Sequence, residues 1–205
     1  MMAPWQIRVL GGLAVFTASL ACGCGSRKEP PPTVPPFRGE RKEWVHLLAR
    51  DREVIDKTMG GLGGTWLVII HSTGSAGASV PALDDYHRRV KGDPLGLPYH
   101  FLIGNGRGVA DGRIHFSADR LAALGSATGT GRGDGSVRLD IGLVGDANRT
   151  APTAAQLAAL GEILDYLKAK GGRLRVRLHN EAEPSPRGCP GSQFPVKELR
   201  EAFPD

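Results

Sequence analysis

Five consecutive apolar residues, Trp66 to Ile70, stand immediately before His71 in the stretch GTWLVIIHSTG. A strand with one solvated face alternates apolar and polar residues, whereas a short continuous apolar run is typical of a strand covered on both faces. Such strands belong to sheets with helices on their faces, and ligands gather where these strands run out into loops. His71 is therefore predicted at a position suited to a functional side chain.

The clearest helix is predicted in the segment APTAAQLAALGEILDYLKAKGG, where Thr153 and Gln156 form a capping box ahead of a face of leucines. The stretch RLRVRLH alternates leucine and valine with arginine, as a strand with one buried face does. His179 ends this strand, as His71 ends the first. The stretch PYHFLIGNGRGVADGRIHFS contains Asn-Gly and Asp-Gly turns and predicts a hairpin.

Further helices are predicted at 42–59 and 79–92, and a further strand at 137–144. The glycine-rich residues 121–137 are expected to form a loop. Strands and helices thus alternate, which indicates a single α/β domain with helices packed on a central β-sheet. The hairpin makes that sheet mixed.

The first 24 residues are interpreted as a lipoprotein-type signal peptide (1–24), because Arg8 precedes an apolar stretch too short to cross about 30 Å of hydrocarbon. Small residues lead into Cys22 and Cys24, as in a bacterial lipobox, and either cysteine could carry the lipid. Neither has the usual leucine three residues upstream, so plain secretion is the alternative. Residues 25–40 hold five prolines and are interpreted as a tether between the lipid and a domain at 41–205.

The formal net charge of +5 is modest and spread along the chain. It suits an anionic polymer or a membrane surface without selecting either. A nucleic-acid partner is not expected for an exported chain that lacks interleaved aromatic and basic residues. We expect a monomer that reaches the membrane through its N-terminal lipid.

Cys189 has no obvious cysteine partner inside the domain, and an unpaired thiol in an exported protein requires a reason. Imidazole and thiolate are ligands that zinc prefers, and His71, His179 and Cys189 lie on segments that could converge. Three protein ligands would leave a fourth position for water, as in catalytic zinc sites. The alternative is that these residues are unrelated.

Four stretches resemble the N-acetylmuramoyl-L-alanine amidase family, which includes phage amidase lysozymes and peptidoglycan recognition proteins. They are WLVIIHST, LPYHFLIGNGRG, IGLVGDANRTAPTAAQLAALGEILDYL and HNEAEPSPRGCPG, in the family's order over residues 66–191. The last is the most specific, because a histidine, a basic residue and then a ligand followed by Pro-Gly is a spacing that chance rarely produces.

The resemblance implies a Zn²⁺ ion held by His71, His179 and Cys189, with Tyr99 in the position of the family's catalytic tyrosine. Arg187 stands where relatives often carry a lysine. Zinc lowers the pKa of bound water and polarises an amide carbonyl, while a phenol and a cation stabilise the developing oxyanion. The simpler alternatives are a tyrosine packed in the hairpin and a solvated arginine.

The expected function is therefore peptidoglycan hydrolysis by a zinc-dependent amidase, which cleaves the amide between N-acetylmuramic acid and L-alanine. The alternatives are a non-catalytic muropeptide-binding module of the same fold and a zinc peptidase that cuts within the stem peptide. The enzyme would face the periplasm as a lipoprotein of the cell envelope. Glycine follows either candidate cysteine, which does not suggest retention in the inner membrane, so the outer membrane is the default expectation.

This chain departs from the family pattern in two places. Leu143 and Val144 stand near the position where some relatives carry a glutamate, and residues 125–136 lack the Ala-His pair of many relatives. Glu181 and Glu183 lie near His179 and could act as a base, although solvated loop carboxylates are the simpler expectation. Asp84, Asp85 and His87 could suggest a second metal, but their spacing on one helix does not bring all three to one face. His46, His100 and His115 are expected at surface, helix or hairpin positions.

Overall fold

The computed structural model describes Phe37 and residues 44–59, 64–124, 136–170, 173–185 and 187–204. The predicted signal peptide at 1–24 lies outside these ranges, as does the tether at 25–40 except for Phe37. Contacts divide the chain into Met1–Pro31 and Pro32–Asp205, and every described residue belongs to the second unit. Within the described part of the chain, no helix is long and apolar enough to cross a membrane.

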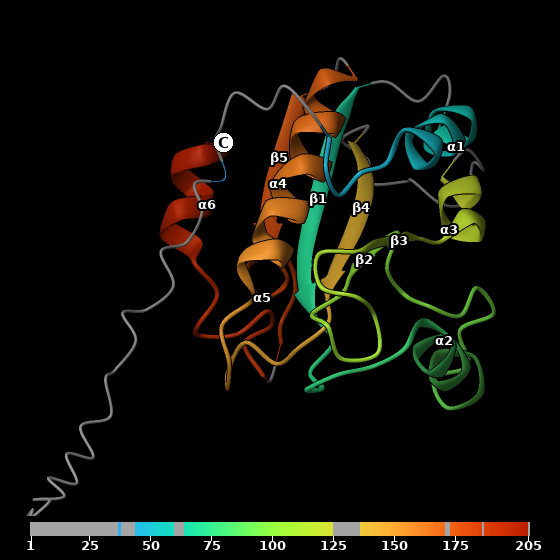
Figure 1. Cartoon of the computed structure of the whole chain (residues 1–205), viewed down its shortest axis with the longest axis vertical. Coiled ribbons are helices and arrows are strands. Elements are labelled where there is room, and N and C mark those ends of the chain that lie inside the picture. The colour runs from blue at the N-terminus through green and yellow to red at the C-terminus, as the bar shows by residue number, and fades with distance from the viewer. Residues whose placement is uncertain are drawn as a thin grey trace, which may run out of the picture. The chain divides into compact units, whose positions relative to one another are not determined.

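A five-stranded mixed sheet forms the centre of this unit, in the order β3-β2-β4-β1-β5 (Figure 1). Strand β1 pairs in parallel with β4 on one side and β5 on the other, β2 is parallel to β4, and β3 is antiparallel to β2. The strands are β1 (Thr65–Ser72), β2 (Phe101–Ile103), β3 (Ile114–Phe116), β4 (Ser136–Leu143) and β5 (Arg173–Leu178). The predicted α/β class, the mixed sheet and the hairpin are confirmed.

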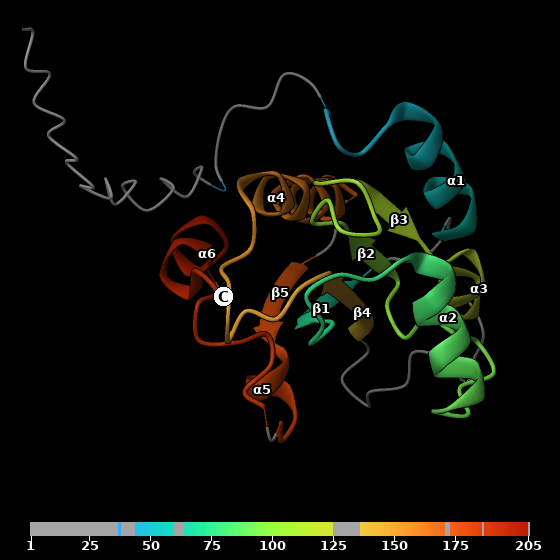
Figure 2. The same cartoon turned by 60° about the horizontal axis from the view of Figure 1, so that its bottom comes forward.

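One face of the sheet is apolar over three successive rows. Trp66 of β1 is level with Val137 of β4 and Leu174 of β5, and the same register continues for two further rows. These side chains share a buried cluster with the leucines of α4 (Ala154–Ala169). Figure 2 shows α4 lying across this face.

Helix α4 begins as the sequence predicts. The Thr153 hydroxyl accepts a hydrogen bond from the Gln156 backbone N–H at 3.0 Å, and the Gln156 side chain accepts one from the Thr153 N–H at 3.1 Å. The buried Gln156 amide also donates to the carbonyls of Ile103 and Val144, at 3.1 and 2.9 Å. The cap therefore fixes the start of α4 over the ends of β2 and β4.

The first predicted helix is shorter than expected, because α1 (Ala49–Met59) begins seven residues after Lys42. The buried carboxylate of Glu162, on α4, accepts the backbone N–H groups of Val45, His46 and Leu47 at 3.2, 2.8 and 2.8 Å. In a helix that began at Lys42, the N–H groups of His46 and Leu47 would instead donate to the carbonyls four residues earlier. This long-range contact has no local signal in the sequence.

Four shorter helices complete the described structure. Helix α2 (Val80–Arg89) is confirmed where it was predicted, with Ser79 as its N-cap. Helix α3 (Ala118–Ala123) occupies the start of the segment expected to be a loop, and β4 begins at Ser136, so the expected loop is wrong at both ends. The residues between, 125–135, lie outside the described ranges. Helices α5 (His179–Ala182) and α6 (Val196–Ala202) were not predicted.

Candidate metal centre

His71 lies on the face of β1 that points away from α4. It is level with Gly142 of β4, and its side chain is nine-tenths buried. The apolar residues before it are buried on both faces, as the continuous run predicts. Because β1 is hydrogen-bonded to a strand on each side, the backbone that carries the imidazole is held in place.

His179 and Cys189 follow β5 in the chain, and both lie close to His71. His179 is the first residue of α5, directly after β5, and Cys189 lies ten residues further on. One ligand atom from each of His71, His179 and Cys189 lies within 4.8 Å of the other two. Among the residues that the structure describes, these are the ones that group as a possible metal site. The predicted trio therefore converges.

Backbone hydrogen bonds hold Cys189 in place. Its carbonyl accepts from the Asn180 N–H at 2.9 Å, and its N–H donates to the Ser185 hydroxyl at 3.2 Å. Its Sγ accepts the Ser72 N–H at 3.3 Å. The thiol is tied to the two segments that carry the histidines.

The two imidazoles leave one nitrogen each for a metal. His71 Nε2 is hydrogen-bonded to Asp140 Oδ1 at 2.8 Å, which leaves Nδ1 on the side of the cluster. His179 Nδ1 is buried and has no hydrogen-bond partner, although burying such a group unpaired is costly. An unpartnered ring nitrogen beside a thiol and a second imidazole fits a soft or borderline divalent cation such as zinc.

Electrostatics favour the thiolate that a metal requires. Burial raises the pKa of Cys189, but hydrogen bonds from His71 and the Ser72 backbone outweigh it and hold that pKa below its ordinary value. Burial lowers the pKa of His71, while its hydrogen bonds with Asp140 and Cys189 raise it to a net value above the ordinary one. The metal-free pair thus tends toward imidazolium and thiolate, and a cation would take the proton's place.

Tyr99 lies beside the cluster, with its ring centroid 5.5 Å from that of His71. A Cβ at Gly142 would come within 2.6 Å of the Tyr99 ring, so only glycine leaves room for the phenol there. Burial raises the pKa of Tyr99 far above its ordinary value. The hydroxyl therefore stays protonated and can donate a hydrogen bond.

Arg187 lies at the edge of the cluster. Its guanidinium packs over Gly74, where a Cβ would be 3.3 Å from Nη1, and Gly74 has a φ of +72°. Asn148 donates from its side chain to the Arg187 carbonyl at 2.9 Å and so fixes the backbone of this loop. The backbone of Arg187 is thus held in place, and its guanidinium lies over the loop that follows β1.

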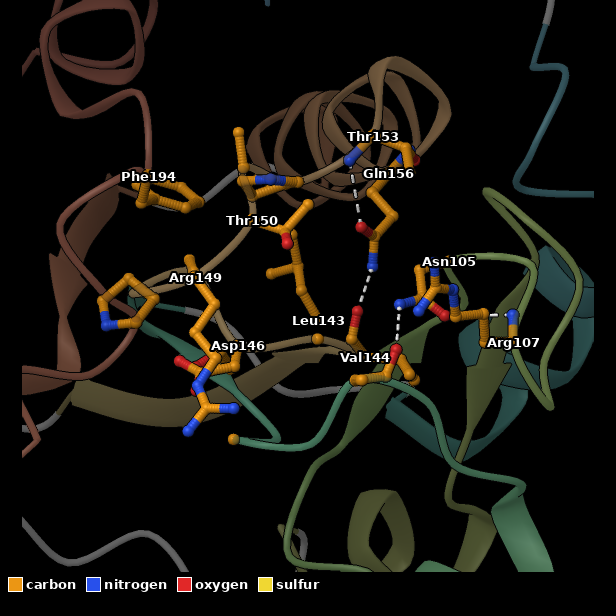
Figure 3. A pocket seen from close by; sticks show the side chains of 18 of the residues that line it. Asn105, Arg107, Leu143, Val144, Asp146, Arg149, Thr150, Thr153, Gln156 and Phe194 are labelled. Atoms are coloured by element: carbon orange, nitrogen blue, oxygen red, sulfur yellow. Dashed lines mark hydrogen bonds and ion pairs between the residues drawn. The ribbon is translucent and has the colours of Figure 1, made fainter.

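Two hollows meet at this point. One, of about 700 Å³, contains all three candidate ligands and Tyr99 and is bordered by α2. The other, of about 500 Å³, lies under the start of α4 and is drawn in Figure 3 with Arg107 and Arg149 on opposite sides of it. Both are lined by Ser72, Gly74, Asp146 and Arg187. The two hollows therefore adjoin at these four residues, and the candidate ligands line the larger one.

The titratable groups near the cluster have more contacts than the sequence indicates. Glu181 and Glu183 are not simply solvated: Glu181 accepts from the Leu178 N–H at 2.8 Å and pairs with Arg200, and Glu183 pairs with Arg138. His100 lies directly before β2, in the segment predicted as a hairpin; its side chain is buried, and its Nδ1 accepts the Asp140 N–H at 2.9 Å. Sequence inspection missed Asp140, Arg138 and Gly142 altogether.

This chain is similar to known proteins in sequence and in fold. Residues 64–192 match the family model described as N-acetylmuramoyl-L-alanine amidase. The fold is similar to the N-acetylmuramoyl-L-alanine amidase LysC from Clostridium intestinale, at 22% identity and a TM-score of 0.52 over 66% of this chain and 82% of that one. It is also similar to the amidase LysCS from Clostridium intestinale, at 24% identity and a TM-score of 0.53 over 66% and 80%.

A Drosophila peptidoglycan recognition protein, SD, shares the fold at 16% identity and a TM-score of 0.50, over 65% of this chain and 78% of that one. Curated proteins give no significant match. The family model covers more than half of the chain and includes all three candidate ligands and both candidate catalytic residues. The chain belongs to the N-acetylmuramoyl-L-alanine amidase family.

Proposed function

We propose that this protein is a zinc-dependent amidase that cleaves peptidoglycan between N-acetylmuramic acid and L-alanine. The observation that carries the proposal is the convergence of His71, His179 and Cys189 ligand atoms within 4.8 Å, with His179 Nδ1 buried and unpartnered. Such a trio leaves a coordination position for water, as in catalytic rather than structural zinc sites. Membership of the amidase family supports the choice of bond.

A zinc ion held there would supply water of lowered pKa and would polarise the amide carbonyl. The chain's own residues have distinct parts in the reaction. Tyr99, protonated because it is buried, donates a hydrogen bond to the oxygen that gains charge as the amide carbon becomes tetrahedral. Arg187 adds a permanent positive charge at the rim, which stabilises that oxygen but cannot move a proton.

The two glutamates near His179 form ion pairs with arginines. Arg200 engages Glu181, and Arg138 engages Glu183. A carboxylate paired with arginine is a weak base, and the pKa values of Glu181 and Glu183 are both held below the ordinary value. Neither is part of the mechanism that we propose.

We further propose that the mature protein is a periplasm-facing lipoprotein, anchored through Cys22 or Cys24, with residues 25–40 as a tether and 41–205 as the enzymatic domain. The support is the order of signal-like, proline-rich and globular segments in the sequence. A tether of this kind would let a monomeric enzyme on the outer membrane reach the wall.

Mass spectrometry of defined muropeptides, incubated with the purified protein and either zinc or a chelator, tests the activity. We expect free stem peptide beginning at L-alanine and glycan without peptide, only when metal is present. The Cys189→Ala variant is the matched control and should give neither product.

Other products would identify a different function. Muropeptide that binds but stays intact with zinc would show a binding module. A product trimmed inside the stem would show a peptidase that uses the same metal.

A further inference from the structure

The nitrogen of each histidine that faces away from the cluster lies near a carboxylate. His71 Nε2 is 2.8 Å from Asp140 Oδ1, with both side chains almost fully buried. His179 Nε2 is 3.7 Å from Glu183 Oε2, on the next turn of chain after α5 begins. Each candidate ligand thus has a carboxylate near its Nε2, within hydrogen-bond distance at His71 and beyond it, in electrostatic contact only, at His179.

Both carboxylates meet at one arginine. Arg138 of β4 contacts Asp140 Oδ1 through Nη2 at 2.8 Å and both Asp140 oxygens through Nε at 3.1 Å. Its other terminal nitrogen, Nη1, pairs with Glu183. A planar guanidinium can hold two carboxylates with separate N–H groups, which an ammonium on a single carbon chain cannot do with the same geometry.

Arg138 therefore connects two parts of the chain that carry different ligands. Asp140 is two residues along the same strand and faces the same side of the sheet, level with Ile69 of β1. Glu183 follows α5, which His179 begins. These contacts connect the two candidate ligands through their Nε2 atoms, by way of Asp140, Arg138 and Glu183. The Nδ1 atoms proposed to bind the metal are not part of the network.

We propose that Arg138 is a positioning residue for both histidine ligands, acting through Asp140 and Glu183. This inference rests on the metal site proposed above. A carboxylate on Nε2 keeps the proton there, turns the Nδ1 lone pair toward the metal and fixes the plane of the ring. One arginine sets the position of both carboxylates, so the two rings are oriented together.

A purely structural ion-pair network would instead stabilise β4 and α5 and leave metal binding unaltered. The two roles differ in what they change. Loss of positioning alters the affinity for metal and the ligand field, whereas loss of a structural ion pair alters only the unfolding transition.

The test compares Arg138→Met, Arg138→Lys and a matched control, Arg175→Met. Arg175 lies on β5 in the same row of the sheet, since both arginines are level with Leu67. Zinc affinity is measured by competition with a chromophoric chelator, and the absorption spectrum of the cobalt-loaded protein reports the ligand geometry. Thermal unfolding of the metal-free proteins is followed in parallel.

We expect Arg138→Met to weaken zinc binding by about 10- to 100-fold and to alter the cobalt bands. Arg138→Lys should recover part of the affinity, and Arg175→Met should match the wild type. Asp140→Asn provides a second variant if Arg138→Met does not fold, with a weakened zinc affinity expected as well.

Equal zinc affinity and identical cobalt spectra in wild type and Arg138→Met would overturn the positioning role, even if the variant unfolded at a lower temperature, and would leave the proposed amidase standing. A wild-type protein that bound neither zinc nor cobalt would overturn the metal centre itself, and the positioning role with it.

Discussion

The two faces of the central sheet differ in chemistry although they share the same strands. Toward α4, β1 presents Trp66, Val68 and Ile70, and the rows beside them are equally apolar. On the other face, Leu67 of β1 is level with Arg138 of β4, and Ile69 is level with Asp140. His71 comes next on this face of β1. Adjacent residues of one strand therefore have different roles, because their side chains alternate between the two faces of the sheet.

This difference separates stability from chemistry. The apolar face buries area against a long helix, which is the main source of folding free energy. The other face carries charged groups that are costly to bury and are accepted only because they are paired. Substitutions one residue apart should consequently have unlike effects.

The largest effect is expected for His71→Ala. Removing one of the proposed zinc ligands should lower the proposed cleavage of muropeptides by at least about 10³-fold, since metal catalysis supplies several kcal/mol, of which about 4 correspond to that factor. Circular dichroism should stay close to wild type, because the apolar face is unchanged. Cleavage at the wild-type rate would show that the polar face is not the site.

The neighbouring substitution Ile70→Ala should have the opposite profile. Ile70 is fully buried on the apolar face, so its truncation should reduce the free energy of unfolding by about 2–5 kcal/mol. Zinc affinity of the folded protein, measured at low temperature, should be nearly unchanged. A stable Ile70→Ala protein that had lost zinc would break the separation of the two faces.

A pH effect on stability is expected from His100. Burial lowers the pKa of His100 from 6.5 to about 4, so the folded protein keeps it neutral where the unfolded chain binds a proton. Stability should thus be unaffected by this group above pH 6.5 and fall as the pH drops from about 6.5 to about 4, by about 3 kcal/mol.

Urea unfolding across this pH range measures that loss. The control is His100→Asn, whose side-chain oxygen can still accept the Asp140 N–H. We expect a visibly smaller loss in the variant, and identical pH profiles would mean that other groups cause the acid sensitivity.

The smallest effect is expected for Gly142→Ala. A methyl group there would lie 2.6 Å from the Tyr99 ring and must displace it. A small displacement of a positioned group lowers the rate, here by about 10-fold, while zinc affinity remains. Activity at the wild-type level would argue that the position of the phenol is unimportant.

The sequence predicts much of this structure, because the informative patterns are local. The apolar run before His71, the alternation in β5 and the capping box of α4 each depend on neighbouring residues, and all are confirmed. The candidate ligands follow from the unpaired Cys189 and the family's Pro-Gly spacing. Their convergence in space is what the structure adds.

What the sequence does not reveal depends on distant contacts. Arg138 and Asp140 look like the solvated side of a strand until Glu183 is placed beside them. The late start of α1 results from Glu162, more than a hundred residues away. Gly142 gains its meaning only from the Tyr99 ring that fills its space.

The most direct test of the central claim is X-ray diffraction from zinc-soaked crystals, with anomalous data on both sides of the zinc edge. We predict one strong peak in bonding contact with Cys189 Sγ and with Nδ1 of both His71 and His179. Asp140 should remain on His71 Nε2. Saturating zinc without a peak at these three atoms, or a peak bound through Nε2, would contradict the account.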